Sequence, residues 1–335
     1  MANETSSLVI MRYIQTEFAR DTFSIHDWRR YRRLVLFLAC TLASFAIAKR
    51  AQAQQPNPQD AFQEFFDKFT NHSNTFMPGF LGELSEEQLN KLAKIEISKS
   101  SEDAFGDRVL KGFLDHCKEK KIKVVQNGKE IAYLQSLCSA VKPLMTNAQR
   151  YTTIDLILVE SEATDAYSIP GGHIVATRGL LETVGTEAAL VGVLAHELSH
   201  LDRGHQLLTL KQMKMLNQSF DMRNPVDVMA IAFKPFRPEF ETQADSDAIR
   251  WMMELQYEPK ELARLLQSWD QRQDKLAPWM NFVPGFVKSH PDASKRSQRI
   301  LEQSNELRTL WPNATYTGSK NLEQRIPANK RRFPR

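Results

Sequence analysis

The sequence predicts a mainly helical α+β fold that contains a small edge β-sheet. The main helical signal is an apolar run over residues 187–203, which contains the letters His-Glu-x-x-His. Two short runs of apolar and β-branched residues, 154–160 and 174–177, predict strands, and a Pro-Gly-Gly turn precedes the second. A further long helix is expected over residues 238–255, because proline suits its first position. The 335 residues are enough for one large or two modest domains.

Composition excludes several classes of protein. Hydrophobic residues make up 42% and charged residues 25% of the chain, which is ordinary for a globular protein. The net charge of +4 is small for this length, so we expect no nucleic-acid partner. The cysteines Cys40, Cys117 and Cys138 form neither a disulfide framework nor a cysteine-based zinc site. In an exported chain Cys117 and Cys138 can pair or stay as buried thiols, and spacing leaves both alternatives open.

Residues 1–53 predict an N-terminal extension and signal peptide. A basic cluster at 29–33 precedes an apolar run over 34–48, and small residues follow at the exit. The fifteen-residue run is shorter than the roughly twenty residues that span a bilayer, which favours a cleaved signal. Lys49 and Arg50, directly after the run, keep an uncleaved membrane anchor as the alternative. The bulk of the chain is expected to be exported, periplasmic or extracytoplasmic, or anchored to the membrane by residues 34–48.

The remaining chain divides into three predicted parts. A linker and N-terminal helices occupy 54–90, the main domain 91–310, and a basic tail 311–335, whose last residues, 329–335, are expected to be mobile. Periodic apolar residues predict helices over 61–70, 84–94, 102–118, 133–147, 179–184, 259–274 and from about 292 to 308. The pair Asn127-Gly128 favours a hairpin turn.

The helix over residues 187–203 carries the main chemical signal. Thr186 can cap its N-terminus and Gly204 is expected to end it. His196 and His200 are four residues apart, so both rings project from one helical face and can bind one metal ion. Glu197 lies one step round the helix, close enough to act on a metal-bound water, which is the zincin arrangement. Incidental histidines on an amphipathic helix are the alternative, but the apolar flanks indicate burial, where unpaired polar groups are costly.

The third ligand is expected on the helix over 238–255. Glu241 and Asp245 share one face of that helix and repel each other unless a cation lies there. Glu241 is therefore the predicted third zinc ligand, and Asp245 is predicted to accept the N–H of a ligand histidine. The small residues Ala244 and Ala248 indicate that this face packs against another helix. Asp247 and Glu239 are assigned to a solvated acidic face.

The strand over 174–177 reaches the metal helix and is expected to form an open sheet edge, to which a peptide can add. The stretch before it supplies the predicted substrate-binding residues, which are Ser168, Ile169, Pro170, Gly171 and Gly172. His173 is assigned to the strand surface. The Met- and Phe-rich segment 205–236 is interpreted as core that partly lines a cleft, with a membrane-facing segment as the alternative.

Four motifs in this order resemble the zinc metallopeptidase family that includes HtpX, the periplasmic BepA-like proteases and the Ste-type CAAX prenyl protease. They are Asp165-Ala-Tyr-Ser-Ile-Pro-Gly-Gly, the His196-Glu197-x-x-His200 helix, Glu241-x-x-Ala-Asp245, and Ser289-His290-Pro291 with Arg296. Asp165 stands where that family has Asn. The resemblance implies a small exported single-domain member and covers roughly residues 90–310. It also implies that the His-Pro segment closes over the site.

These observations together predict one Zn²⁺ ion, held by His196, His200 and Glu241 with water as the fourth ligand. Glu197 is the predicted general base, and His290 is the candidate oxyanion donor. His205 is the weaker alternative donor, because it is turned away from the ligand face.

The predicted function is a zinc metalloendopeptidase that cleaves unfolded or unassembled envelope or secreted proteins in quality control. A zinc-bearing, chaperone-like envelope assembly factor with little or no proteolysis is the alternative. A non-peptidase zinc hydrolase is a third interpretation. Association with a membrane surface is left open, and the oligomeric state is unknown.

Overall fold

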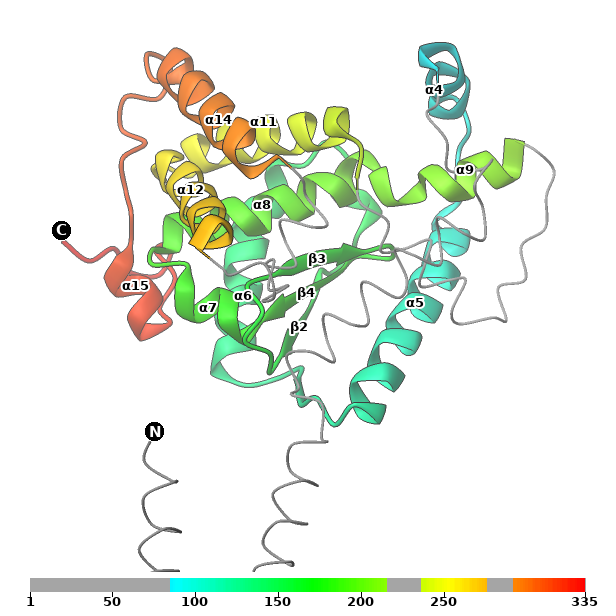
Figure 1. Cartoon of the computed structure of the whole chain (residues 1–335), viewed down its shortest axis with the longest axis horizontal. Coiled ribbons are helices and arrows are strands. Elements are labelled where there is room, and N and C mark those ends of the chain that lie inside the picture. The colour runs from blue at the N-terminus through cyan, green and yellow to red at the C-terminus, as the bar shows by residue number, and fades with distance from the viewer. Residues whose placement is uncertain (1–84, 216–235, 276–291, 335) are drawn as a thin grey trace, which may run out of the picture. The chain divides into compact units, whose positions relative to one another are not determined.

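The computed structural model describes residues 85–215, 236–275 and 292–334 (Figure 1). The helices are α4 (Glu86–Ala93), α5 (Lys99–Glu119), α6 (Lys129–Val141), α7 (Arg178–Thr183), α8 (Glu187–Arg203), α9 (Leu208–Met215), α11 (Pro238–Glu254), α12 (Lys260–Lys275), α14 (Ala293–Leu307) and α15 (Ser319–Gln324). The strands are β1 (Val124–Val125), β2 (Asp155–Val159), β3 (Ala166–Ile169) and β4 (His173–Thr177). The predicted mainly helical α+β fold is confirmed. The predicted signal segment, the helix over 61–70 and His290 lie outside the described residues.

The described strands form one mixed sheet in the order β1-β2-β4-β3. β2 and β4 are parallel, with Leu156 opposite Ile174, whereas β3 runs antiparallel to β4, with Ser168 opposite Ile174. The expectation that the strand over 174–177 forms the open edge is therefore wrong. β4 is an inner strand, and β3 is the edge that faces away from the rest of this sheet. The Pro-Gly-Gly turn reverses the chain between β3 and β4, so β3 takes the outer place.

The two faces of the sheet are covered by different helices. Alternate strand residues point to opposite faces, because side chains along a strand have a period of two. Ile157 and Val175 pack with Phe105, Val109 and other residues of α5. The neighbouring Leu156, Leu158, Ile174 and Ala176 belong to the larger core formed with α6 and α8. Figure 1 shows the resulting layers, with α8 between the sheet and the group of α11, α12 and α14.

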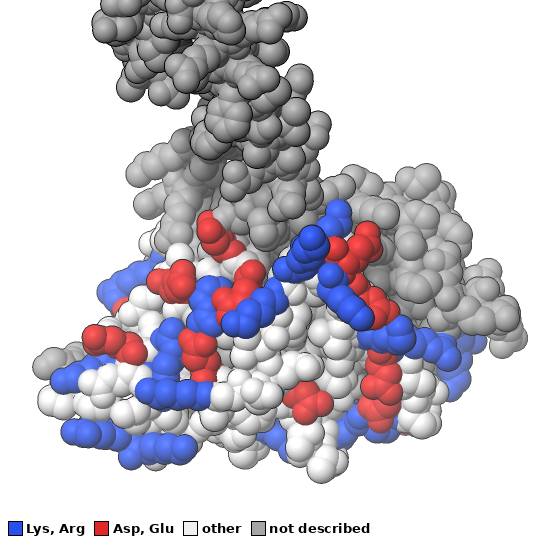
Figure 2. Space-filling view, turned by 90° about the horizontal axis from the view of Figure 1, so that it is seen from below, with Lys and Arg blue, Asp and Glu red and all other residues white. Residues whose placement is uncertain are grey.

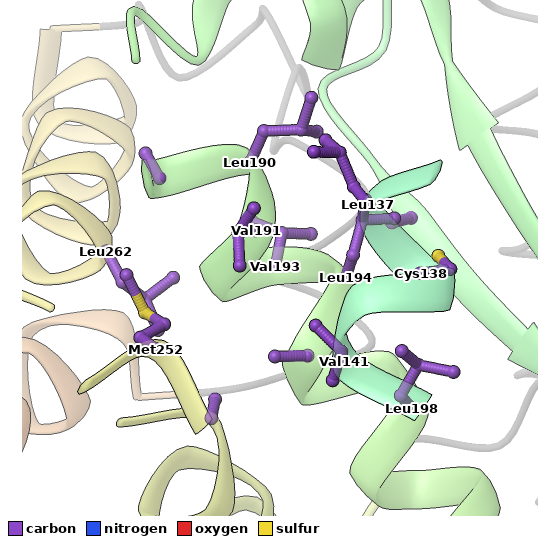
Figure 3. Close-up of a cluster of buried hydrophobic side chains, with 14 of the residues drawn as sticks. Leu137, Cys138, Val141, Leu190, Val191, Val193, Leu194, Leu198, Met252 and Leu262 are labelled. Carbon is purple, nitrogen blue, oxygen red and sulfur yellow. The ribbon is translucent and has the colours of Figure 1, made fainter. Parts of the chain in front are cut away.

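Helix α8 is the central element of the larger core. Its leucine and valine side chains contact α6 on one side, where Figure 3 shows Leu137 and Val141, and face α11 and α12 on the other. On that second side Met252 and Leu262 approach closely (Figure 3). Sixteen of its residues, Glu187 to Asp202, are buried. Because α8 is packed on every side, the polar groups on it must find partners inside the protein.

Two local predictions differ from the structure. Helix α6 begins at Lys129 and ends at Val141, earlier than the predicted 133–147, because Pro143 follows and cannot continue the α-helix. The Asn127-Gly128 pair does not close a hairpin. Instead, β1 pairs with the distant β2, and Gly128 lies at the N-cap of α6 with a positive φ of 102°.

The described C-terminal residues pack onto the domain, and these contacts include part of the stretch 329–335, for which mobility stays a prediction. Asn321 in α15 donates its amide N–H groups to the carbonyls of Ile326 and Arg331. The backbone N–H of Ala328 donates to Glu187 at the start of α8, at 2.9 Å. Phe333 is also buried. The segment joins the same core as the metal helix.

Further observations bear on the predictions for thiols, membranes and charge. Cys117 and Cys138 are buried free thiols in two different hydrophobic clusters, and burial raises the pKa of each to about 12. Within the described residues, no helix combines the length and apolar character needed to cross a bilayer. Figure 2 shows basic and acidic side chains interspersed on one face of the molecule, so the net charge is not gathered there.

Candidate metal centre

The metal helix has the local signals that its sequence predicts. The hydroxyl of Thr186 accepts the backbone N–H of Ala189 at 3.1 Å, which caps the N-terminus of α8. Gly204 ends the helix in the left-handed conformation, with φ 65°. Between these ends the rings of His196 and His200 lie on one side of the helix, with centroids 4.7 Å apart.

Three groups from two helices converge in the interior. The Nε2 atoms of His196 and His200 are 3.0 Å apart, and each lies 3.4 Å from a carboxylate oxygen of Glu241 on α11. All three side chains are fully or almost fully buried. Within the described residues this trio is the group of His, Cys, Asp and Glu side chains that could hold a metal ion. Two imidazoles and a carboxylate are a ligand set that zinc prefers.

The electrostatics of the trio favour one positive charge between its members. Burial and Arg296 lower the pKa of His196, but Glu241 and Asp245 outweigh them and raise it to about 9. Burial, with help from the charge of His196, holds the pKa of His200 well below its ordinary value. The site therefore takes up one proton between the two rings, in the place where a metal cation would bind. Glu241 balances that charge.

Asp245 and Arg296 support the trio from the far side. Oδ1 of Asp245 lies 3.0 Å from Nδ1 of His196, so the carboxylate accepts the ring N–H and directs Nε2 toward Glu241. Arg296 on α14 is fully buried and donates to both oxygens of Asp245, at 2.8 and 2.7 Å, and to Glu241 at 3.0 Å. Burial raises the pKa of Asp245, yet the charges of Arg296 and His196 lower it below its ordinary range. Asp245 is therefore a fixed anion.

Glu197 is held by the edge strand. The backbone N–H and the hydroxyl of Ser168 in β3 both donate to Oε2 of Glu197, each at 2.9 Å. The side-chain amide of Gln206 donates to the same hydroxyl at 2.8 Å. These contacts place the predicted general base between the two predicted ligands on α8 and the outer strand of the sheet. Gln206 has no counterpart among the sequence predictions.

His205 lies beside the trio, although a continued helix would turn it away from the ligand face. Its Nδ1 is 2.9 Å from Nδ1 of His200, and its Nε2 is 3.0 Å from the side-chain oxygen of Gln243. The short turn after Gly204 folds the chain back, which a straight helix would not do. His205 therefore contacts a predicted ligand, and its alternative role as oxyanion donor stays a prediction.

A family comparison agrees with this geometry. The profile of Peptidase family M48 matches residues 132–304, which is 173 of the 335 residues. The chain belongs to peptidase family M48. The match includes His196, Glu197, His200, Glu241 and Asp245, so the whole buried cluster around the two histidines lies inside the family region.

Two curated relatives are similar to the M48 region. Mitochondrial metalloendopeptidase OMA1 of Schizosaccharomyces pombe is 25% identical over 158 residues, which cover 44% of this chain and 46% of the relative. The protein of the same name from Arabidopsis thaliana is 24% identical over 161 residues, or 46% of this chain and 32% of the relative. The alignments thus span less than half of each relative. They support the family, while the branch that includes HtpX, BepA and the prenyl protease stays a prediction.

The donor set fits the metal that M48 peptidases use, which is typically zinc. His196 and His200 would supply imidazole nitrogens, and Glu241 would supply a carboxylate oxygen. The observation that supports this fit is the convergence of three buried ligand atoms, one from each side chain, which all lie within 4.8 Å of one another. The ligand roles remain predictions that metal analysis can test.

The first two predicted substrate-binding residues, Ser168 and Ile169, have different surroundings. Ser168 reaches Glu197, whereas Ile169 packs in the α5 cluster behind the sheet. Gly171 and Gly172 have φ values of 93° and 101°, which only glycine adopts readily. Their substrate-binding role stays a prediction.

Helix α5 holds this turn from behind. The buried carboxylate of Glu102 accepts the N–H of Gly171 at 3.2 Å, the hydroxyl of Tyr151 at 2.9 Å and the Nε–H of Arg150 at 2.5 Å. A Cβ atom on Gly106 would lie 1.9 Å from the carbonyl oxygen of Pro170, so only glycine permits this approach. No motif marks Glu102 in the sequence, because a single acidic residue on an amphipathic helix is ordinary.

Two acidic residues, Asp165 and Asp247, are buried. Asp165 is fully buried, and burial together with the charge of Glu197 raises its pKa well above the ordinary value. The surroundings of Asp165 therefore disfavour its charged form. Asp247 is not on a solvated face, because it is buried and accepts from Arg203 and from Ser199 of α8. Glu239 is exposed, as expected.

Proposed function

We propose that this chain is a zinc-dependent metalloendopeptidase that cleaves unfolded or unassembled proteins outside the cytoplasm, in protein quality control. The observation that carries the proposal is the junction of Ser168 and Glu197, which ties the base beside the His–His–Glu trio to an edge strand. An edge strand offers backbone groups to an extended peptide, and such pairing does not depend on the peptide's sequence. The predicted signal region supports the location.

The mechanism assigns a task to each residue. A bound zinc ion would act as a Lewis acid toward the scissile carbonyl and toward water. Glu197 takes the proton of the attacking water and passes it to the leaving amine, with its carboxylate oriented by the two donors of Ser168. Asp245 keeps the proton of His196 on Nδ1, so that Nε2 stays available as a ligand. Arg296 keeps Asp245 anionic.

Casein degradation by the purified full chain tests the proposal. We expect activity that a chelator abolishes and zinc restores. Glu197→Gln should abolish degradation while zinc stays bound, and Glu241→Ala should lower zinc stoichiometry. Glu239→Ala is the matched control, because Glu239 is exposed on the same helix as Glu241.

Two outcomes would contradict the proposal. Full degradation by Glu197→Gln would exclude the general-base role. Zinc binding without proteolysis, combined with suppression of aggregation of an unfolded protein, would favour the chaperone-like factor instead.

A further inference from the structure

The ring of His200 has a partner at each nitrogen. Its Nε2 faces His196 and Glu241, at 3.0 and 3.4 Å. Its Nδ1 lies 2.9 Å from Nδ1 of His205, a residue on the short turn that follows the metal helix. Neither nitrogen of His200 faces solvent, since the side chain is fully buried. The partner at Nδ1 therefore decides which way the ring is turned.

The positions of the protons follow from the ligand role of Nε2. A metal ligand nitrogen must offer its lone pair, so the single proton of neutral His200 is on Nδ1. That proton must be donated to Nδ1 of His205, which then has to be the unprotonated nitrogen of its own ring. The proton of His205 is consequently on Nε2, and the oxygen of Gln243 lies 3.0 Å away to accept it. One arrangement of protons satisfies the whole chain of contacts.

Packing keeps both rings in this geometry. His205 stacks on Phe240, with ring centroids 4.2 Å apart and an interplanar angle of 3°. His200 stacks on Phe236, at 3.8 Å and 13°. His205 is itself buried, and Gln243 lies on α11 two residues after Glu241. Because the aromatic partners fix the ring planes, the hydrogen bonds have little freedom to exchange for others.

We propose that His205 is a positioning residue for His200, which fixes the orientation and the tautomer of that ligand through a relay that ends at Gln243. The relay is uncharged, in contrast with the support of His196, where the carboxylate of Asp245 accepts the proton. The two predicted ligands thus have different hydrogen-bond partners: His196 contacts the anion of Asp245, and His200 contacts the neutral imidazole of His205. The inference rests on the proposed zinc site.

Zinc affinity, measured by competition with a chromophoric chelator on the full chain, tests the relay. His205→Phe retains a ring that can stack on Phe240 but removes the acceptor, and should weaken zinc binding about 10- to 100-fold. His205→Asn places an amide oxygen near the position of Nδ1 and should recover most of that loss. His116→Phe, the same change in α5, is the matched control and should bind zinc as the unmodified protein does.

Histidine-selective nitrogen NMR gives a readout that does not depend on a variant. In the zinc-loaded protein we expect a protonated Nδ1 on His200, and on His205 a protonated Nε2 with a bare Nδ1. A proton on Nδ1 of His205 would overturn the proposal, as would unchanged zinc affinity in a folded His205→Phe protein. If His205→Phe does not fold by circular dichroism, the NMR assignment decides. Failure of the unmodified chain to bind zinc would instead contradict the proposed function.

Discussion

The backbone N–H and the hydroxyl of Ser168 both lie 2.9 Å from Oε2 of Glu197. This pair joins the outer strand of the sheet to the metal helix at the predicted general base. A substrate that pairs with β3 would therefore lie beside the residue that orients the base. The relationship makes the hydroxyl of Ser168 a direct contributor to the alignment of Glu197.

Ser168→Ala should lower kcat without removing the metal. The substitution deletes one hydrogen bond to a carboxylate, which is worth about 1.5–3 kcal/mol and corresponds to a loss of roughly 10- to 100-fold. Zinc content should be unchanged, because Ser168 contacts no predicted ligand. Ser199→Ala is the control, since that hydroxyl lies on α8 but donates to Asp247. Equal kcat values for the Ser168 and Ser199 variants would remove this role from Ser168.

Arg296→Gln should destabilise the zinc-free protein more than the zinc-loaded protein. Without the guanidinium, Asp245 and Glu241 are buried carboxylates that have lost their shared cation, which costs about 3–5 kcal/mol. Bound zinc restores a positive charge beside Glu241 and should recover part of that loss. Thermal unfolding with and without zinc measures the difference. An equal loss of stability with and without zinc would show that bound zinc does not compensate for the missing guanidinium charge.

Zinc binding should become tighter as pH rises toward 9. In the zinc-free protein the pKa of His196 is raised to about 9, so below that pH the ring carries a proton that zinc must displace. Apparent affinity should rise about tenfold per pH unit and level off above pH 9. Calorimetry in buffers of different ionisation enthalpy counts the released proton. Asp245→Asn removes one of the interactions that raise this pKa, so its plateau should begin at lower pH. A flat profile between pH 7 and 9 would contradict the prediction.

We expect Glu187 to secure the C-terminal segment through the hydrogen bonds that it accepts more than through a negative charge. Its carboxylate accepts from Tyr133, Tyr257 and the N–H of Ala328, yet burial still raises its pKa. Glu187→Gln should therefore cost little stability. Glu187→Ala leaves buried donors unpaired and should lower the free energy of unfolding by about 2–4 kcal/mol.

Hydrogen exchange and thermal unfolding check the Glu187 prediction. We expect faster exchange over residues 319–334 in Glu187→Ala, because the Ala328 contact is lost. Glu182→Ala, an exposed position on α7, is the control for stability. Unchanged exchange in the C-terminal segment would show that Glu187 does not secure it.

Local patterns predicted the elements and much of the buried cluster. The four-residue spacing of His196 and His200 places both rings on one face, whatever the helix packs against. Thr186 and Gly204 mark the ends of α8 for equally local reasons, a side-chain cap and a left-handed residue. The same holds for the shared face of Glu241 and Asp245. These features depend on geometry within a few residues, so they can be predicted from the sequence alone.

Contacts between distant segments could not be derived in this way. Nothing local indicates that the guanidinium of Arg296 is fully buried, that β1 pairs with β2, or that Glu102 anchors the turn before β4. His205 shows the limit most clearly. Extending the helix past Gly204 turns its ring away, whereas the actual turn brings it to His200.

The spacing of the motifs therefore determined which side chains can act as ligands and base, because helical periodicity is local. The tertiary structure determined their protonation and orientation. It did so by packing α8 between β3 and α11, which buries each polar group and gives it partners inside the protein, such as Ser168 for Glu197 and Asp245 for His196. Burial restricts the protonation and orientation of these side chains, because an unpaired polar group is costly in the interior.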